Sequence, residues 1–350
     1  MAEDKQEFTT IDQQIELLKR RKLIINDENE AKELLQLYGY YNIINGYKEP
    51  YIIKSDNGNE EYKKGTSFHQ IYSLFILDHT IRNMVMLSMI DIEERLRSIT
   101  SYVVAEAFTS NHKEYLKPFH YRDTNNPDAK FSRKNILANM SNALNSGKDP
   151  IKYSMDTYNN VPPWILFRGI YMSTLFNFIK LQKPKQKEKI IEYAYNIPSE
   201  LAQIENIKKY FTESLFLFLD YRNLAAHAGR IYNYDSKNNI KISSEMASDI
   251  SMFSTVGTSI QSSNRLLRLI NSLALFSNKD PVNNLCQTIN KAFTFHISQY
   301  PMDLEYIINS TGISSDSLQI KMPNSHNYVP LNNYLKTDTV QQEVAATKEQ

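Results

Sequence analysis

The residues best suited to chemistry lie close together in the sequence, where Arg222, Asn223 and His227 follow an apolar run at residues 215–219. Arg222 is the only arginine in the chain with a histidine five to seven positions downstream. Histidine transfers protons near neutral pH, and arginine offers a permanent planar charge that matches phosphate oxygens. Together they can remove a proton from a hydroxyl group and stabilise a phosphate that gains charge in the reaction.

A helix must carry these side chains. The run at 215–219 can only be buried, because a helix that is apolar on every side lies in a core or an interface. Asn223 and His227 are four residues apart and share one face, with Arg230 one turn further along. Arg222 lies about 140° from His227 on an ideal helix. The two converge through the long arginine side chain, a loosened last turn or a second subunit.

The same cluster has a purely structural interpretation. Gly229 is a residue type that ends helices. A histidine near such an end is favoured by the helix dipole, and Arg222 and Arg230 could bond the last carbonyl groups. The spacing leaves both interpretations open.

The composition excludes several classes of protein. With 41% hydrophobic residues, the 350-residue chain can build a sizeable core, and its 9 glycines include no GxGxxG or Walker sequence for nucleotide-fuelled chemistry. The single cysteine, Cys286, cannot form an intrachain disulfide. Because the histidines show no HExxH spacing, we expect no metal site and no cofactor. No apolar stretch has the length of a signal peptide or a spanning helix, which predicts a cytoplasmic protein with no membrane partner.

The net charge of +1 conceals two basic runs that are candidate RNA contacts. Solvated helix ends explain short basic runs equally well. The first run is Lys19, Arg20, Arg21 and Lys22, and the second is Lys180, Lys183, Lys185, Lys187 and Lys189.

The hydrophobic pattern predicts an all-α fold, mainly helical, with one small β-hairpin near 51–62 around Asp56-Asn57-Gly58. Such a chain is neither a Rossmann fold nor a barrel. We expect a long helix to start at Ser199 and reach the cluster, with Ser199 as its N-cap. Other helices are expected at 11–24, 30–38, 68–108, 132–146, 164–181, up to Ala194, 244–277 and 280–298.

Three segments, in this order, resemble the Abi (abortive infection) family of bacterial phage-defence proteins, of the AbiD/AbiF type, whose catalytic domain belongs to the HEPN superfamily of helical ribonucleases. The last segment is similar to the HEPN signature Arg-x4–6-His, in the form with asparagine after the arginine. The segments are residues 17–25 with 37–42 and 46–47, residues 161–167, and residues 221–233.

The resemblance implies three parts of the chain. Residues 1–66 would form an N-terminal helical lead-in with the hairpin, and 67–312 a HEPN-like helical bundle that carries the arginine and histidine. Residues 313–350 would be a polar C-terminal tail, partly disordered. The catalytic residues would be Arg222, Asn223 and His227.

Two further features have a functional and a structural interpretation. Glu93 and Arg97 are similar to a Glu-x3-Arg element that HEPN proteins carry, but residues four apart on a helix also form ordinary ion pairs. Together with Arg230 they are the candidate supporting residues. Trp164, the only tryptophan, is expected to be a core anchor rather than a platform for base stacking.

The function implied is a metal-independent endoribonuclease of phage defence, toxin-like, which cuts RNA by 2′-hydroxyl attack and leaves 2′,3′-cyclic phosphate ends. Full acid and base catalysis needs two proton-transfer groups, and one motif histidine per chain therefore points to a homodimer. The resemblance implies silencing by a structured small RNA or an antitoxin. The alternatives are a non-catalytic RNA-binding or nucleotide-binding helical module of a defence or toxin–antitoxin system, and a helical scaffold.

Overall fold

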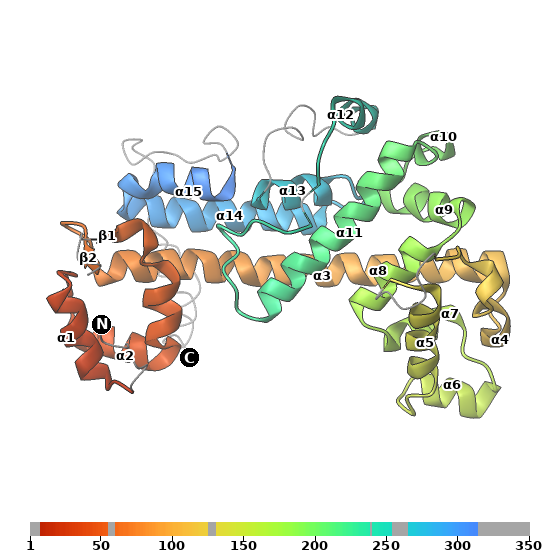
Figure 1. Cartoon of the computed structure of the whole chain (residues 1–350), viewed down its shortest axis with the longest axis horizontal. Coiled ribbons are helices and arrows are strands. Elements are labelled where there is room, and N and C mark those ends of the chain that lie inside the picture. The colour runs from red at the N-terminus through yellow and green to blue at the C-terminus, as the bar shows by residue number, and fades with distance from the viewer. Residues whose placement is uncertain (1–7, 55–59, 125–130, 239, 254–264, 314–350) are drawn as a thin grey trace, which may run out of the picture. The chain divides into compact units, whose positions relative to one another are not determined.

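The computed structural model describes residues 8–54, 60–124, 131–238, 240–253 and 265–313, and the chain is mainly helical (Figure 1). The predicted all-α fold class is confirmed. Strands β1 (Ile52–Lys54) and β2 (Glu60–Tyr62) pair in antiparallel fashion, with Ile53 opposite Glu61, which confirms the hairpin. The turn predicted at 56–58 and residues 314–350 of the predicted tail lie outside the described residues.

The chain divides into two compact units. Unit 1 contains residues Met1–Ile81, Thr288–Ser310 and Ser314–Gln350, and unit 2 contains residues Arg82–Gln287 and Thr311–Ile313. The uninterrupted pattern at 68–108 is consistent with one long helix or with two helices joined by a tight kink. The structure has one continuous helix, α3 (Phe68–Phe108), which contributes residues to both units. Helix α14 (Asp280–Gln299) does the same.

The helices of unit 1 begin at well-defined caps. Thr10 forms a capping box with Gln13 at the start of α1 (Ile11–Arg20). Asp27 accepts a hydrogen bond from the backbone of Glu30 at the start of α2 (Glu28–Tyr38). Helix α15 (Leu304–Thr311) belongs to this unit up to Ser310.

A buried polar network lies in the core of unit 1. His296, with no exposed surface, contacts the Ser73 hydroxyl at 2.8 Å and the Asp303 carboxylate at 2.9 Å. Tyr51 donates to the same carboxylate at 2.6 Å, and Gln70 at 3.0 Å. Burial acts to raise the pKa of Asp303, but the hydrogen bonds to its carboxylate outweigh burial and hold the pKa below its usual value. The ionised carboxylate of Asp303 therefore connects α14, α3 and the segment before β1.

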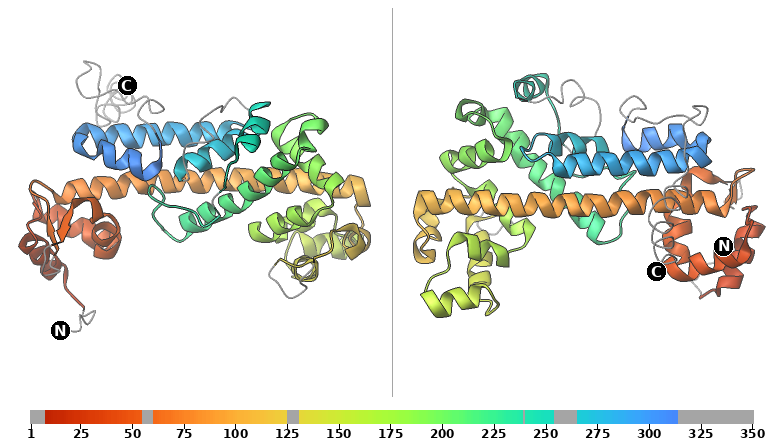
Figure 2. Two further views of the ribbon diagram at one scale, coloured as in Figure 1. Left: turned by 45° about the horizontal axis from the view of Figure 1, so that its top comes forward. Right: turned by 180° about the vertical axis from the view of Figure 1, so that it is seen from behind.

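In unit 2 the long helix α11 packs against α8, α9, α10, α12 and α13. Figure 2 shows α11 running obliquely across the part of α3 that belongs to this unit. The helices of the unit other than α3 and α14 are α4 (His112–Tyr115), α5 (Arg133–Leu144), α6 (Ile151–Tyr158), α7 (Pro163–Leu166), α8 (Met172–Leu181), α9 (Pro184–Tyr195), α10 (Ser199–Ala202), α11 (Glu205–Ala226), α12 (Ser244–Ser251) and α13 (Leu266–Ala274).

Three predicted helices are wrong in their extent. The helix expected at 164–181 is interrupted after α7 by a 3₁₀ turn at Phe167–Gly169, where Gly169 lies so close to Ile151 that a Cβ atom would meet its Cδ1 at 2.4 Å. The helix expected from Ser199 is divided because Ile204 is extended, so Ile204, not Ser199, is the N-cap of α11. The prediction for 244–277 is also divided into α12 and α13, with 254–264 outside the described residues.

The C-terminus of α11 is closed by a Schellman motif. The Gly229 N–H donates to the Leu224 carbonyl at 2.8 Å, and the Ala228 N–H to the Ala225 carbonyl at 3.3 Å. The left-handed residue is Ala228, with φ of 56°, rather than the expected Gly229. Gly229 is needed for another reason, since a Cβ atom there would meet Leu224 Cδ1 at 2.2 Å and its carbonyl oxygen at 3.2 Å.

The buried network predicts a large effect of Asp303→Ala. Removing the carboxylate leaves buried partners unsatisfied, so unfolding should become easier by about 3 kcal/mol. The wild type is more stable than the variant only while the Asp303 carboxylate is ionised, and folding lowers the pKa of that group. The difference in stability should therefore be present above about pH 4 and decline as the pH falls below that value. Urea unfolding at several pH values measures both effects. Glu305→Ala, at an exposed carboxylate on α15, is the matched control and should change stability little.

The helix end predicts opposite effects at two adjacent positions. The left-handed conformation of Ala228 destabilises the folded state by about 1–2 kcal/mol. Glycine removes this strain, but its greater freedom in the unfolded chain offsets about 0.4–1 kcal/mol. Ala228→Gly should therefore stabilise the protein by about 0.5–1 kcal/mol. Gly229→Ala should destabilise by about 1–3 kcal/mol through the contact with Leu224. Thermal melts of the two variants would contradict this account if they shifted in the same direction.

Candidate active site at the end of helix α11

The polar end of α11 combines a buried base with an exposed tip. Tyr221 is fully buried, whereas Arg222 is half-buried and both Asn223 and His227 are exposed. The prediction that the apolar run is buried is confirmed for Leu215, Leu217 and Phe218, while Phe216 and Leu219 are half-buried. The helix therefore holds its last turn against the core and presents the polar side chains to solvent.

Arg222 reaches the face of the helix that carries Asn223. Its Nη1 donates to Asn223 Oδ1 at 3.3 Å. Asn223 in turn lies one turn before His227, whose backbone N–H donates to the Asn223 carbonyl at 3.1 Å. This contact joins Arg222 to its neighbour Asn223, and the convergence of Arg222 with the His227 ring stays a prediction. The His227 ring has no hydrogen-bond partner among the residues that the structure describes, so both ring nitrogens remain available to a substrate.

The structural interpretation requires Arg222 to bond a terminal carbonyl group. Among the described residues Arg222 makes no such bond. The carbonyl of Ala228 instead accepts a hydrogen bond from the buried Arg82 of α3 at 3.2 Å. The carbonyls of Leu224 and Ala225 are satisfied by the Schellman motif. Arg222 is therefore not needed to cap this helix.

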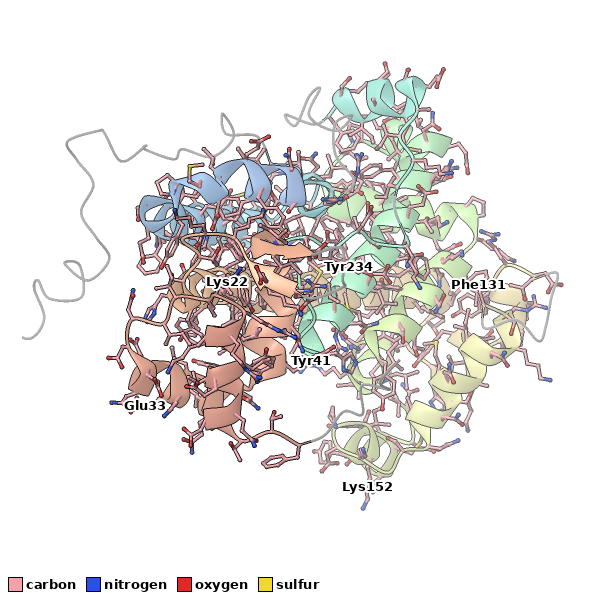
Figure 3. The ribbon with its side chains drawn as sticks, turned by 60° about the vertical axis from the view of Figure 1, so that its left-hand side comes forward. Lys22, Glu33, Tyr41, Phe131, Lys152 and Tyr234 are labelled. Atoms are coloured by element: carbon pink, nitrogen blue, oxygen red, sulfur yellow. The ribbon has the colours of Figure 1, made fainter. Side chains whose placement is uncertain are left out.

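The segment after the helix folds back along α11. Asp220 accepts hydrogen bonds from Ser236 at 2.6 Å and from Asn238 at 2.9 Å. Tyr234, labelled in Figure 3, packs edge-on against Tyr221 with ring centroids 5.4 Å apart. Burial raises the pKa of Tyr221, which keeps its hydroxyl neutral. The polar tip is thus bordered by a strap, residues 231–238, that is fixed to the helix.

The expectation that Arg230 continues the stripe of Asn223 and His227 is wrong. Helix α11 ends at Ala226, His227 is its C-cap, and the left-handed Ala228 turns the chain away before Arg230. Arg230 belongs to the turn after the helix, and its role as a supporting residue stays a prediction.

Glu93 and Arg97 form an ion pair on α3, but away from the motif. Arg97 also donates to the carbonyl of Ile170 at 2.7 Å, in the segment before α8. The contact of α3 with the end of α11 is made by Arg82, and at 1.5 Å per residue Glu93 and Arg97 lie about 16–22 Å further along the axis. Within one chain the structure does not bring this pair to His227.

Trp164 is not a core anchor, contrary to the sequence prediction. Its side chain is 51% exposed, because the single turn α7 buries Pro163 and Leu166 on the opposite side. Trp164 lines a pocket of about 680 Å³ together with Glu93 and Arg97.

Most of the first basic run is paired with carboxylates. Lys19 contacts Glu16 and Glu28, and Arg21 contacts Glu60 at 3.3 Å. Lys22, labelled in Figure 3, contacts Glu61. Arg20 is exposed and has no ion-pair partner within the described part of the chain. Nearby carboxylates therefore neutralise most of the positive charge of this run.

The second basic run divides into three groups. Lys183 donates to the Phe119 carbonyl at 2.7 Å, and Lys189 pairs with Glu192 at 3.4 Å. Lys185 is exposed. Lys180 and Lys187 line a pocket formed by α8, α9, α11 and the strap.

Sequence reasoning missed the other cations of that pocket. They are Arg122, Lys208, Lys209 and Lys237. A signal was present, because Glu205, Lys209, Thr212 and Phe216 are spaced by four, three and four residues and so form one face of α11.

Searches for other kinds of site gave two results. Within the described ranges, no three His, Cys, Asp or Glu side chains lie close enough together to hold a metal ion. In the same part of the chain, no helix is long and apolar enough to cross a membrane.

Comparison with known proteins identifies the family. A family model described as Abi-like protein matches residues 33–233, more than half of the chain, and includes the end of α11. No curated protein and no solved structure matches the chain. The chain belongs to the Abi-like protein family, which is associated with abortive infection, a bacterial defence against phage.

Proposed function

We propose that the protein is a metal-independent endoribonuclease of the HEPN type, which acts in abortive infection. The observation that carries the proposal is the contact of Arg222 with Asn223 on the exposed helix face of His227. An arginine used only to cap the helix would bond a terminal carbonyl, and a histidine used only for packing would be buried.

The reaction follows from the chemistry of these side chains. His227 removes the proton of a ribose 2′-hydroxyl, and the 2′-oxygen attacks the adjacent phosphorus. Arg222 stabilises the charge that develops on the phosphate oxygens. The bond to the 5′-oxygen breaks and that oxygen takes up a proton, which leaves a 2′,3′-cyclic phosphate and a 5′-hydroxyl. Asn223, whose oxygen faces Arg222, keeps its NH₂ group free to bond the ribose or the imidazole.

The active species in this proposal is a homodimer. Proton removal and proton delivery need two groups, and each chain supplies one motif histidine. An apolar surface supports the assembly, because α3 exposes Leu87 (55%) and Ile90 (39%) shortly after Arg82, the residue that holds the end of α11. Two copies joined through this surface would bring two motifs into one cleft.

A ribonuclease of this kind must be silenced in an uninfected cell. A structured small RNA is the proposed partner, with a protein antitoxin as the other candidate. Because Lys19, Arg21 and Lys22 are paired with carboxylates, the cations of the pocket lined by Lys180 and Lys187 are the better candidates for RNA contacts.

The two motif residues should fail in different ways when mutated. His227→Ala should lower the rate of RNA cleavage by about two to four powers of ten with nearly unchanged RNA affinity, because it removes only a proton-transfer group. Arg222→Lys should also be inactive, since an ammonium group cannot make the bidentate contact with phosphate oxygens. Cleavage by the wild type should survive EDTA and leave cyclic phosphate ends, which mass spectrometry detects.

These measurements separate the rival functions. A non-catalytic RNA-binding module would show no cleavage with any variant, although RNA would bind. Full activity of Arg222→Lys would remove the arginine from the mechanism, and activity lost in EDTA and restored by Mg²⁺ would remove the metal-free reaction.

If the active species is a dimer joined through α3, charged side chains introduced on α3 should abolish RNA cleavage although they lie outside the motif. Leu87→Glu with Ile90→Glu should produce a monomer in analytical ultracentrifugation and lose cleavage, while circular dichroism stays unchanged. Leu37→Glu is the matched control, because Leu37 is an equally apolar side chain with 71% exposure on α2 of unit 1. A monomer that cuts RNA at full rate at every concentration would contradict the dimer.

A further inference from the structure

A second polar site lies beside the N-terminal half of α11. It is a pocket of about 790 Å³ between α8, α9, α11 and the strap, a size typical of small-molecule sites. The first turns of α9 and α11 both line it, with Pro184 and Glu205, and helix N-termini attract anions.

The charge of the pocket is strongly positive. Its lining includes only two carboxylates, Glu205 and Glu213, and Lys208 is paired with Glu205 and with Glu188 outside the pocket. Among the described residues the other cations form no ion pair with a carboxylate, although Glu213 interacts electrostatically with Lys209 and Glu205 with Lys187. The six cations of the lining are Arg122, Lys180, Lys187, Lys208, Lys209 and Lys237.

The cations repel one another in this setting. Burial and the nearby Arg122 lower the pKa of Lys180, and the same two causes lower the pKa of Lys187 to about 8. Lys180 lies over the ring of Phe216, with Nζ 5.1 Å from the centroid. A bound anion would relieve this repulsion, so the pocket is suited to phosphate.

The pocket also contains buried acceptors without partners. Gln182 is 1% exposed, its Nε2 donates to the Phe178 carbonyl at 2.9 Å, and its Oε1 has no partner. Glu213 Oε2 is likewise buried and unbonded, and burial raises the pKa of this carboxyl group. Unpaired buried acceptors are costly, and a ligand that donates hydrogen bonds would satisfy them.

We propose that this pocket binds a nucleotide, with its phosphates among the lysines and the hydroxyl or amino groups of its nucleoside at Gln182 and Glu213. Phosphate groups satisfy the cations, and a nucleoside adds hydroxyl or amino donors for these acceptors, so a nucleotide supplies both. The nucleotide is either free or one residue of an RNA chain. In the second case the inference rests on the proposed function, because Phe216 lies about 9 Å along α11 from Arg222.

The test is titration calorimetry on the full chain carrying His227→Ala, so that RNA is not consumed. The probes are metal-free ATP, GTP, CTP and UTP, inorganic triphosphate and hexauridylate. At least one nucleotide probe should bind, and Lys187→Gln should weaken it tenfold or more. Lys185→Gln is the matched control, since it removes the same charge from an exposed position of the same helix and should change affinity less than twofold.

Three further results define the ligand. Inorganic triphosphate should bind at least tenfold more weakly than the preferred nucleotide, and Gln182→Met should remove that preference. Glu213→Leu serves the same purpose if the buried Gln182 variant does not fold. Tighter binding of hexauridylate identifies RNA as the source of the nucleotide, and tighter binding of a nucleoside triphosphate identifies a free ligand.

The pH dependence provides an independent check. Because burial and Arg122 lower the pKa of Lys187 to about 8, affinity should fall between pH 7 and pH 9 in the wild-type pocket and fall less with Lys187→Arg. The charged groups that act on Lys187 are Arg122, Lys180, Glu205 and Lys208.

The proposal is overturned if no probe binds, if Lys185→Gln weakens binding as much as Lys187→Gln, or if inorganic triphosphate binds as tightly as every nucleotide. Because binding is measured without cleavage, a protein that fails to cut RNA but binds nucleotide in this pattern would refute only the proposed function. Cleavage without such binding would refute only the pocket.

Discussion

The polar end of the molecule depends on one constraint, the abrupt stop of a helix whose preceding turns are buried. Tyr221 is fully buried, and two residues of the Schellman motif end the helix directly after His227. The guanidinium of Arg82 holds the turn from α3. These contacts satisfy the backbone groups at the helix end, so the polar side chains there are not needed for stability. The hydrogen bond between Arg222 and Asn223 contributes at most about 0.5–1.5 kcal/mol. Side chains freed in this way can be selected for chemistry alone.

The sequence predicted what depends on local pattern. The apolar pattern at 68–108 predicted a helix over that range, and the helices expected at 30–38 and 132–146 correspond to α2 and α5. The sequence correctly placed Asn223 on the last turn of α11, whereas His227 is the C-cap residue directly after it. These features need only helix geometry and caps, which a single segment determines.

The sequence did not predict what depends on distant contacts. Gly229 looked like the left-handed residue, yet its task is to approach Leu224, and Ala228 adopts the left-handed conformation instead. Trp164 is exposed because a one-turn helix, and not a long one, carries it. The pocket cations come from segments as far apart as Arg122 and Lys237, and no spacing rule connects them. Such features appear only when tertiary contacts are known.

The way in which the chain alternates between the two units has an evolutionary consequence. The chain passes between them after residues 81, 287, 310 and 313, and the first two of these points lie inside α3 and α14. Recombination usually exchanges a contiguous segment that begins and ends in loops. Neither unit is such a segment, so neither can be transferred to another gene as a module. New specificities in this architecture would have to arise by point substitution or by exchange of loops, with both units inherited together.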